Sequence, residues 1–249
     1  MLRLYKANMA RFLKNIYFIG GCIIALAATY AVTDNIILFP FLENKDISLR
    51  MFFVSAAMVA FFTVYIPVFT NAEYTDGTIR NKLIAGYSQK QVFLSLYLSY
   101  ASLCLIMWVC YMTGGLIAGA DPFGTCLSAN IIMLLALMAF IAFMLALSFR
   151  ITKMVLVVIG AGVIFQTCFS MVMFGNAILM VLSDAGNDTA VFIASVIYNV
   201  NALGQWFSHT GFADDITNPG NFLQMIISLG LVMLMYFAGS AGLDKRDVL

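Results

Sequence analysis

Residues 73–91 read EYTDGTIRNKLIAGYSQKQ, and this long polar stretch lies between apolar runs at residues 51–70 and 92–118. Each run is long enough to cross a bilayer core of about 30 Å, which takes about 20 helical residues. A polar stretch of this length cannot be left in hydrocarbon, so the two runs must meet water between them. The pattern predicts two antiparallel spans joined by a structured loop over residues 71–91.

The composition of the whole chain is that of a polytopic membrane protein. Of 249 residues, 63% are hydrophobic and 10% are charged, and the mean hydropathy is +0.96. Soluble domains carry about 25% charged residues. Apolar runs of spanning length lie at residues 16–33, 51–70, 92–118, 128–149, 154–182 and 222–243. Because these runs are continuously apolar and lack period-two alternation, we expect an all-α membrane protein with six transmembrane helices.

The positions of Lys and Arg predict the orientation. With a cytoplasmic N-terminus, eleven of the 13 basic residues fall inside, and only Lys45 and Arg50 fall outside. This asymmetry follows the positive-inside rule and places both termini in the cytoplasm. No repeat, linker or boundary is visible, so we expect a single transmembrane domain over residues 1–249.

Two further helical segments are expected outside the six spans. Residues 1–14 alternate apolar and basic side chains at helical spacing, which predicts an amphipathic helix in the inner membrane interface. Within residues 183–220, the apolar run 189–207 is interrupted by polar residues and flanked by acids on both sides. We expect a re-entrant or outer-surface helix pair there. The alternative is an apolar extracellular loop packed on the ends of the spans.

The loop between the second and third spans carries local helix signals. Thr78 is expected to cap a short helix over residues 79–85, with Gly86 in the C′ position. Ser88 and Gln91 have the spacing of a capping box that opens the third span. The short helix is well below the 12 to 15 residues at which an isolated helix is marginal in water. Other parts of the protein must therefore hold it.

This loop resembles the coupling helix of the permease subunits of type-2 ATP-binding-cassette (ABC) exporters. In that family, a Glu at the cytoplasmic end of the second span precedes a Gly-Thr-x-Arg-x-Lys-Leu-x-x-Gly-like stretch. The residues here that match are Glu73, Gly77, Thr78, Arg80, Lys82, Leu83 and Gly86. The six-span layout, the element between spans five and six and the charged residues 244–247 extend the resemblance loosely over the chain.

The resemblance implies that the loop contacts a separate ATPase subunit. On the short helix, Ile79 and Leu83 would form an apolar ridge, with Arg80 and Lys82 at its basic rim. Glu73 would either join this contact or brace the loop internally, through Arg80 or through the N-terminal Arg11 and Lys14. An ordinary solvated loop is the alternative to both.

The sequence contains no set of residues for enzymatic chemistry. It has no Gly-x-x-x-x-Gly-Lys-Ser/Thr motif, so ATP and Mg²⁺ would be bound by two copies of a partner ATPase. It has one histidine, His209, and its five cysteines lack Cys-x-x-Cys spacing. We therefore expect no catalytic residue, no metal site and no cofactor in this chain. We expect no nucleic-acid partner either.

A substrate path is expected along the second and fifth spans. No ionisable residue lies mid-span, which weighs against an ion-driven transporter. In the resembled family these two spans line the path at the interface of a permease dimer. The candidate path residues are Phe61, Phe62, Tyr65, Phe165, Gln166, Phe169, Met173 and Asn176. Aromatic and Met side chains would suit an apolar or amphipathic substrate. Ordinary packing or lipid contact is the alternative, with Gln166 as a structural hydrogen-bonding residue.

The resemblance as a whole implies the multi-pass membrane subunit of an ABC exporter in a bacterial plasma membrane. The chain would pair with a second copy, or with a related permease, in the lipid bilayer. It is similar to permeases that export antimicrobial peptides, including those of lantibiotic immunity and of phenol-soluble modulins. Export of sodium or small drugs is one alternative, and a six-span channel or scaffold without an ATPase is another. A membrane enzyme is the third.

Overall fold

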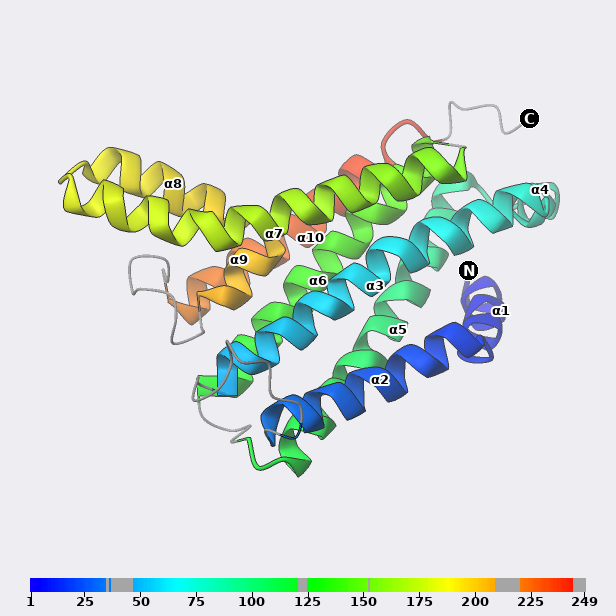
Figure 1. Cartoon of the computed structure of the whole chain (residues 1–249). Helices are drawn as coiled ribbons and strands as arrows, with labels where there is room; N and C mark the ends of the chain where they lie inside the picture. The colour runs from blue at the N-terminus through cyan, green and yellow to red at the C-terminus, as the bar shows by residue number, and fades with distance from the viewer. Residues whose placement is uncertain (35, 37–46, 121–124, 152, 209–219, 244–249) are drawn as a thin grey trace.

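A computed structural model describes residues 1–34, 36, 47–120, 125–151, 153–208 and 220–243, and within these ranges every regular element is a helix. Figure 1 shows them as a bundle with a long arm. The helices are α1 (Leu2–Leu13), α2 (Ile16–Thr33), α3 (Ile47–Thr75), α4 (Thr78–Ile84), α5 (Gln89–Ile117), α6 (Thr125–Arg150), α7 (Met154–Asp184), α8 (Asp188–Val200), α9 (Ala202–Phe207) and α10 (Asn221–Ser240).

Six of these helices are long and apolar enough to cross a membrane, which confirms the predicted number. They are α2, α3, α5, α6, α7 and α10. Side-chain caps fix the starts of two of these helices, and the second of these caps is the one predicted from the sequence. Asn15 accepts from the backbone N–H groups of Tyr17 and Phe18 at the start of α2. Ser88 and Gln91 form the expected capping box at the start of α5.

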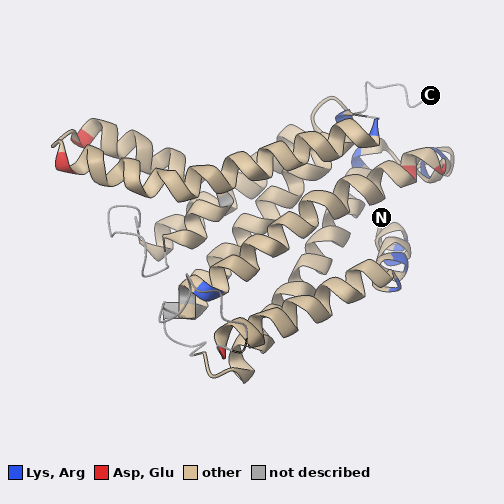
Figure 2. Cartoon of the chain, viewed as in Figure 1, with Lys and Arg blue, Asp and Glu red and all other residues tan. Residues whose placement is uncertain are grey.

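The helices divide into a buried centre and an exposed periphery. Most of α3, α5 and α6 is buried, whereas α2, α7 and α10 leave most of their surface exposed. The exposed side chains of these outer helices are largely apolar, as lipid contact requires. Lys, Arg, Asp and Glu gather toward the ends of the bundle (Figure 2).

Contacts at both ends show that α6 and α10 run parallel. At one end the Asn221 side-chain amide donates to the Ser128 hydroxyl over 2.8 Å. At the other end the Arg150 guanidinium donates to the Ala238 carbonyl over 2.6 Å. Since α7 leads away from the Arg150 end, the segment between α7 and α10 must begin and end on the opposite side of the bundle.

The predicted segment 189–207 accordingly forms two helices rather than a seventh span. α8 folds back alongside α7, and α9 packs against α6 (Figure 1). The break falls at Asn201, whose side chain accepts from the backbone N–H of Leu203 and donates to the Cys168 carbonyl on α7 over 2.7 Å. α8 has 13 residues, about 20 Å of helix, which is too short to cross a bilayer.

α1 is an amphipathic helix at the end of the bundle that also carries α4 (Figure 1). Its buried face consists of Leu4, Asn8 and Phe12, which recur every four residues. Arg3 and Lys6 are exposed. The predicted helix is thus present, and the face that packs on the protein is the one with Leu4, Asn8 and Phe12.

The first prediction concerns how often the chain crosses the bilayer. Single cysteines replacing Asp188 and Asp214, in a variant without native cysteines, should both react with an impermeant thiol reagent added to intact cells. The parallel course of α6 and α10 requires an odd number of crossings between them, and α7 supplies one. Reaction at only one of the two positions would mean a seventh crossing.

Candidate functional site

The carboxylate of Glu73 joins three helices at the end of α3. Its side chain is 1% exposed. The Arg11 guanidinium of α1 pairs with Oε1, and the Lys82 ammonium of α4 donates to Oε2 over 2.7 Å. A buried carboxylate is tolerated only where partners of this kind replace its lost hydration. Glu73 therefore fixes α1 and α4 to the end of a membrane-spanning helix.

Neutral side chains extend this ion cluster to α5. Lys82 also donates to Asn8 Oδ1 over 3.1 Å, and Asn8 Nδ2 donates to the Ser95 hydroxyl over 3.0 Å. Asn8 and Ser95 are both buried. A continuous set of polar contacts thus runs from α3 through α4 and α1 to α5, and we call Arg11, Glu73, Lys82, Asn8 and Ser95 the polar junction.

Aromatic packing holds α1 in place beside the polar junction. Phe12 is 1% exposed and stacks on Tyr100 of α5 with ring centroids 4.9 Å apart. The Arg11 guanidinium lies 4.9 Å from the Phe12 ring centroid. Stacking and cation–π contact each add about 0.5–1.5 kcal/mol beyond area burial. The position of Arg11 is therefore set by packing as well as by its charge partner.

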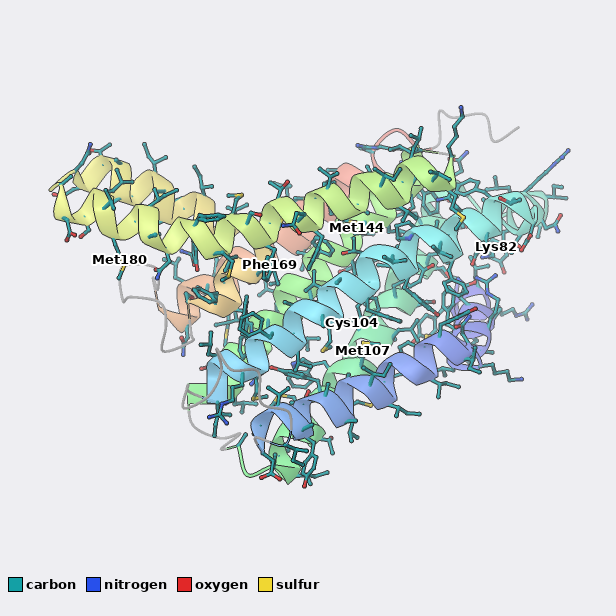
Figure 3. The ribbon with its side chains drawn as sticks, in the orientation of Figure 1. Lys82, Cys104, Met107, Met144, Phe169 and Met180 are labelled. Atoms are coloured by element: carbon teal, nitrogen blue, oxygen red, sulfur yellow. The ribbon has the colours of Figure 1, made fainter. Side chains whose placement is uncertain are left out.

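Lys82 occupies the least hydrated cationic position of the polar junction, with 12% of its side chain exposed against 43% for Arg11. Its location at the end of the bundle is visible in Figure 3. Burial, and then repulsion from Arg11, lowers the pKa of Lys82 to about 8. The ammonium is charged at neutral pH and pairs with the Glu73 carboxylate.

The start of α4 differs from the sequence prediction by one residue. Gly77, with φ of 68°, is the N-cap, and Thr78 is the first helical residue. Glycine takes a left-handed conformation without strain, so it can make the sharp turn out of α3. The other end agrees with the prediction. Gly86 follows the cap residue with φ of 88° and donates to the Leu83 carbonyl.

The apolar ridge expected on α4 is rotated from its predicted position. Ile79 is 1% exposed and packs into the core, and Leu83 packs partly against that core. These contacts hold a helix that is too short to be stable alone. The side chains that face outward are Arg80, Asn81 and Ile84, with Ile84 75% exposed. The sequence predicted a ridge of Ile79 and Leu83 and a rim of Arg80 and Lys82. Of these four side chains, only Arg80 is part of the outward surface.

The candidate path residues fall into two separate groups. Phe61, Phe62 and Tyr65 belong to an aromatic cluster with Phe12, Phe69 and Tyr100, between α1, α3 and α5. Phe62 and Tyr65 are buried. On α7, Phe165 stacks on Phe169, which Figure 3 labels.

The remaining path candidates also lie on α7 and differ in exposure. Met173 is 43% exposed, Gln166 is exposed and Asn176 is buried. Although α3 and α7 are neighbours in the bundle, no ring contact links the two aromatic groups among the described residues.

Sequence reasoning did not single out Asn8, Ser95 or Ile84. A weak signal exists for Asn8, because it lies on the apolar stripe of an amphipathic helix, where a polar side chain needs a buried partner. Ser95 carries no such signal, since serines are common in spans. The exposure of Ile84 follows from the rotation of α4, which depends on tertiary packing.

Comparison of the chain with protein-family models and with curated proteins gave no match.

The second prediction tests the polar junction as a structural device. Glu73→Gln removes the charge that compensates Arg11 and Lys82 and should lower the free energy of unfolding in detergent by about 3 kcal/mol. Lys82→Met should cost less, because Arg11 remains to pair with Glu73. Arg80→Gln is the control, since Arg80 is exposed. Equal thermal stability of the Glu73→Gln and Arg80→Gln variants would show that Glu73 does not hold α1 and α4 together.

Proposed function

We propose that this chain is the membrane subunit of an ATP-driven exporter of the type-2 ABC class, with ATP hydrolysed by a separate subunit that contacts α4. The observation that carries the proposal is the attachment of α4 to the end of α3 through the buried Glu73. A short polar helix held this firmly is suited to transmit force from a partner. A loop without this attachment would deform under the force and would not transmit it to α3.

The outward surface of α4 supports the proposal because it combines one apolar side chain with polar neighbours. Ile84 is 75% exposed, and Arg80 and Asn81 are exposed beside it. A single apolar anchor within a polar rim is the usual composition of a protein–protein contact. The ATPase would take Ile84 into an apolar groove, with Arg80 at the edge.

A second copy of the chain is expected to pack against α7. Gly162, Gln166 and Ser170 recur every four residues and so share one side of this helix. Gln166 is exposed apart from a 3.3 Å hydrogen bond to Ser170, and a Cβ added at Gly162 would meet no atom within 4 Å. An amide facing hydrocarbon is costly, whereas a hydrogen bond between helices is worth about 1–2 kcal/mol. Pairing of two copies across this side would satisfy Gln166.

The expected cargo is apolar or amphipathic, in the class of antimicrobial peptides. The exposed side chains of α7 include Val163, Met171, Met173 and Phe174, and no charged residue lies within the middle of this helix. A wall of Met and aromatic side chains adapts to varied apolar shapes without demanding fixed hydrogen bonds. Of the candidates named from the sequence, the α7 group carries this proposal. The buried Phe62 and Tyr65 pack in the core.

The third prediction tests the ATPase contact on α4. With the ATPase that is encoded beside this chain or that co-purifies with it, Ile84→Asp should reduce capture by at least tenfold, because a charge would enter an apolar groove. Asn81→Asp adds the same charge to the same exposed helix and should leave capture within twofold. Equal capture by both variants would remove Ile84 from the contact. Failure of the wild-type chain to bind any ATPase would favour the channel or scaffold.

The fourth prediction tests the dimer. A cysteine replacing Gln166, in a background without native cysteines, should form a crosslink between two copies in membranes treated with a mild oxidant. A cysteine replacing Leu234, which is 58% exposed on α10, is the matched control and should stay monomeric. Crosslinking at position 234 and none at position 166 would place the partner on α10 instead.

A further inference from the structure

An apolar groove runs along α2 where that helix faces α3. It encloses about 340 Å³, and no charged residue lines it. On α2 the lining residues Gly21, Ala25, Ala28 and Val32 recur at helical spacing. From Gly21 to Val32 the groove is about 16 Å long, which is roughly half the thickness of a bilayer core.

The groove exists because the side chains of α2 on this side are small. Ala25 and Ala28 leave space that larger residues would fill, whereas a Cβ added at Gly21 would come within 2.9 Å of Met107 Cε. On the neighbouring side, α2 lies close to α5, where a Cβ added at Gly114 would come within 2.3 Å of the Leu26 carbonyl oxygen. This contact keeps α2 against α5 and leaves the gap toward α3 open. Met107 of α5, labelled in Figure 3, forms part of its floor.

The groove opens sideways, toward the surface that spanning helices present to lipid. Ile24, at one rim, is 68% exposed, and Ala57, which lines the α3 side, is also exposed. Both residues lie within membrane-spanning helices. A molecule that enters the groove must therefore come from the bilayer.

A buried cation lies at the end of the groove away from α1 and α4. Arg50 precedes the lining residues Phe53 and Val54 by three and four positions on α3, so it shares their side of the helix. It is 8% exposed, and its Nη1 donates to the Thr33 carbonyl at the end of α2 over 3.3 Å. This contact places the guanidinium next to Val32, the last lining residue of α2.

The hydrogen-bonding capacity of this end is incompletely used. Nε of Arg50 and Oγ1 of Thr33 are both buried and have no hydrogen-bond partner among the residues that the structure describes. The two ion pairs in the described ranges both involve Glu73, so Arg50 pairs with no described carboxylate. Asp34 follows Thr33 but is exposed. A buried cation with an unpaired N–H favours an anionic ligand.

We propose that this groove binds an anionic phospholipid, with one acyl chain along α2 and α3 and the phosphate at Arg50. The shape matches one leaflet, because an apolar channel half a bilayer long ends at a cation near the bundle end. The lipids of a bilayer have this arrangement, with an acyl chain that extends through one leaflet and a phosphate at its end. The site does not depend on the ATPase partner or on the cargo.

The first experiment locates the acyl chain. The purified full-length chain is illuminated with phosphatidylglycerol that carries a photoreactive group in one acyl chain, and the labelled peptides are sequenced. We expect labels in residues 21–32 and 53–61. Ala28→Phe fills the groove and should reduce this labelling at least fivefold, whereas Ala27→Phe, at the exposed neighbouring position, should not. Equal labelling of the two variants would overturn the groove as the site.

The second experiment tests the headgroup. Native mass spectrometry of the delipidated chain should show phosphatidylglycerol bound about tenfold more tightly than phosphatidylcholine with the same acyl chains. Arg50→Gln keeps a donor for the Thr33 carbonyl and should abolish this preference, and Arg50→Lys should retain part of it. Equal binding of the two lipids to the wild-type chain would overturn the proposal. A preference that survives Arg50→Gln would overturn the role of Arg50. If the Arg50→Gln variant is not monodisperse, the proposal is judged by the lipid preference of the wild-type chain and by the loss of photolabelling in the Ala28→Phe variant.

Discussion

The buried carboxylate of Glu73 is the constraint on which the end of the bundle that carries α1 and α4 depends. Removing a charge from water costs several kcal/mol, and here the cost is offset only because two cations arrive from separate helices. Arg11 comes from α1 and Lys82 from α4, so neither helix can move without exposing or unpairing the carboxylate. The N-terminal helix is therefore part of the candidate site, in addition to any contact it makes with the membrane.

In the opposite half of the molecule, hydrogen bonds between neutral amides and hydroxyls hold the helices together. Gln224 of α10 donates to Asn199 of α8 over 2.9 Å and to the Ser208 hydroxyl over 2.7 Å, and Ser228 donates to Gln205. All these side chains are buried. Within a span, amides and hydroxyls are far less costly than ions, and their mutual hydrogen bonds fix helices that apolar contacts alone would let slide. This network accounts for the polar residues that interrupt the run at 189–207.

The sequence was sufficient for features that depend on neighbours along the chain. Hydropathy located six spans, and the spacing of Ser88 and Gln91 identified a real capping box. The sequence was insufficient for features that depend on the backbone conformation of a turn or on tertiary packing. Thr78 was expected to cap α4 because its hydroxyl is a good acceptor, but the turn needed the left-handed Gly77. Ile79 was expected at the surface because helical spacing shows which residues share a side without showing which way that side points.

α3 carries the two charged positions of greatest interest at its opposite ends, Arg50 and Glu73, and Pro67 lies between them. Pro67 has no N–H to donate, so the helical ladder is interrupted there, and the Asn71 side chain donates to the Pro67 carbonyl over 3.0 Å. α3 packs against α2, α6 and α7, and its end after Pro67 is also held by the polar junction and by the contact of Tyr74 with Phe149 of α6. Pro67 is buried, so packing around this turn as well as the missing hydrogen bond determines how far a force applied at α4 could bend α3.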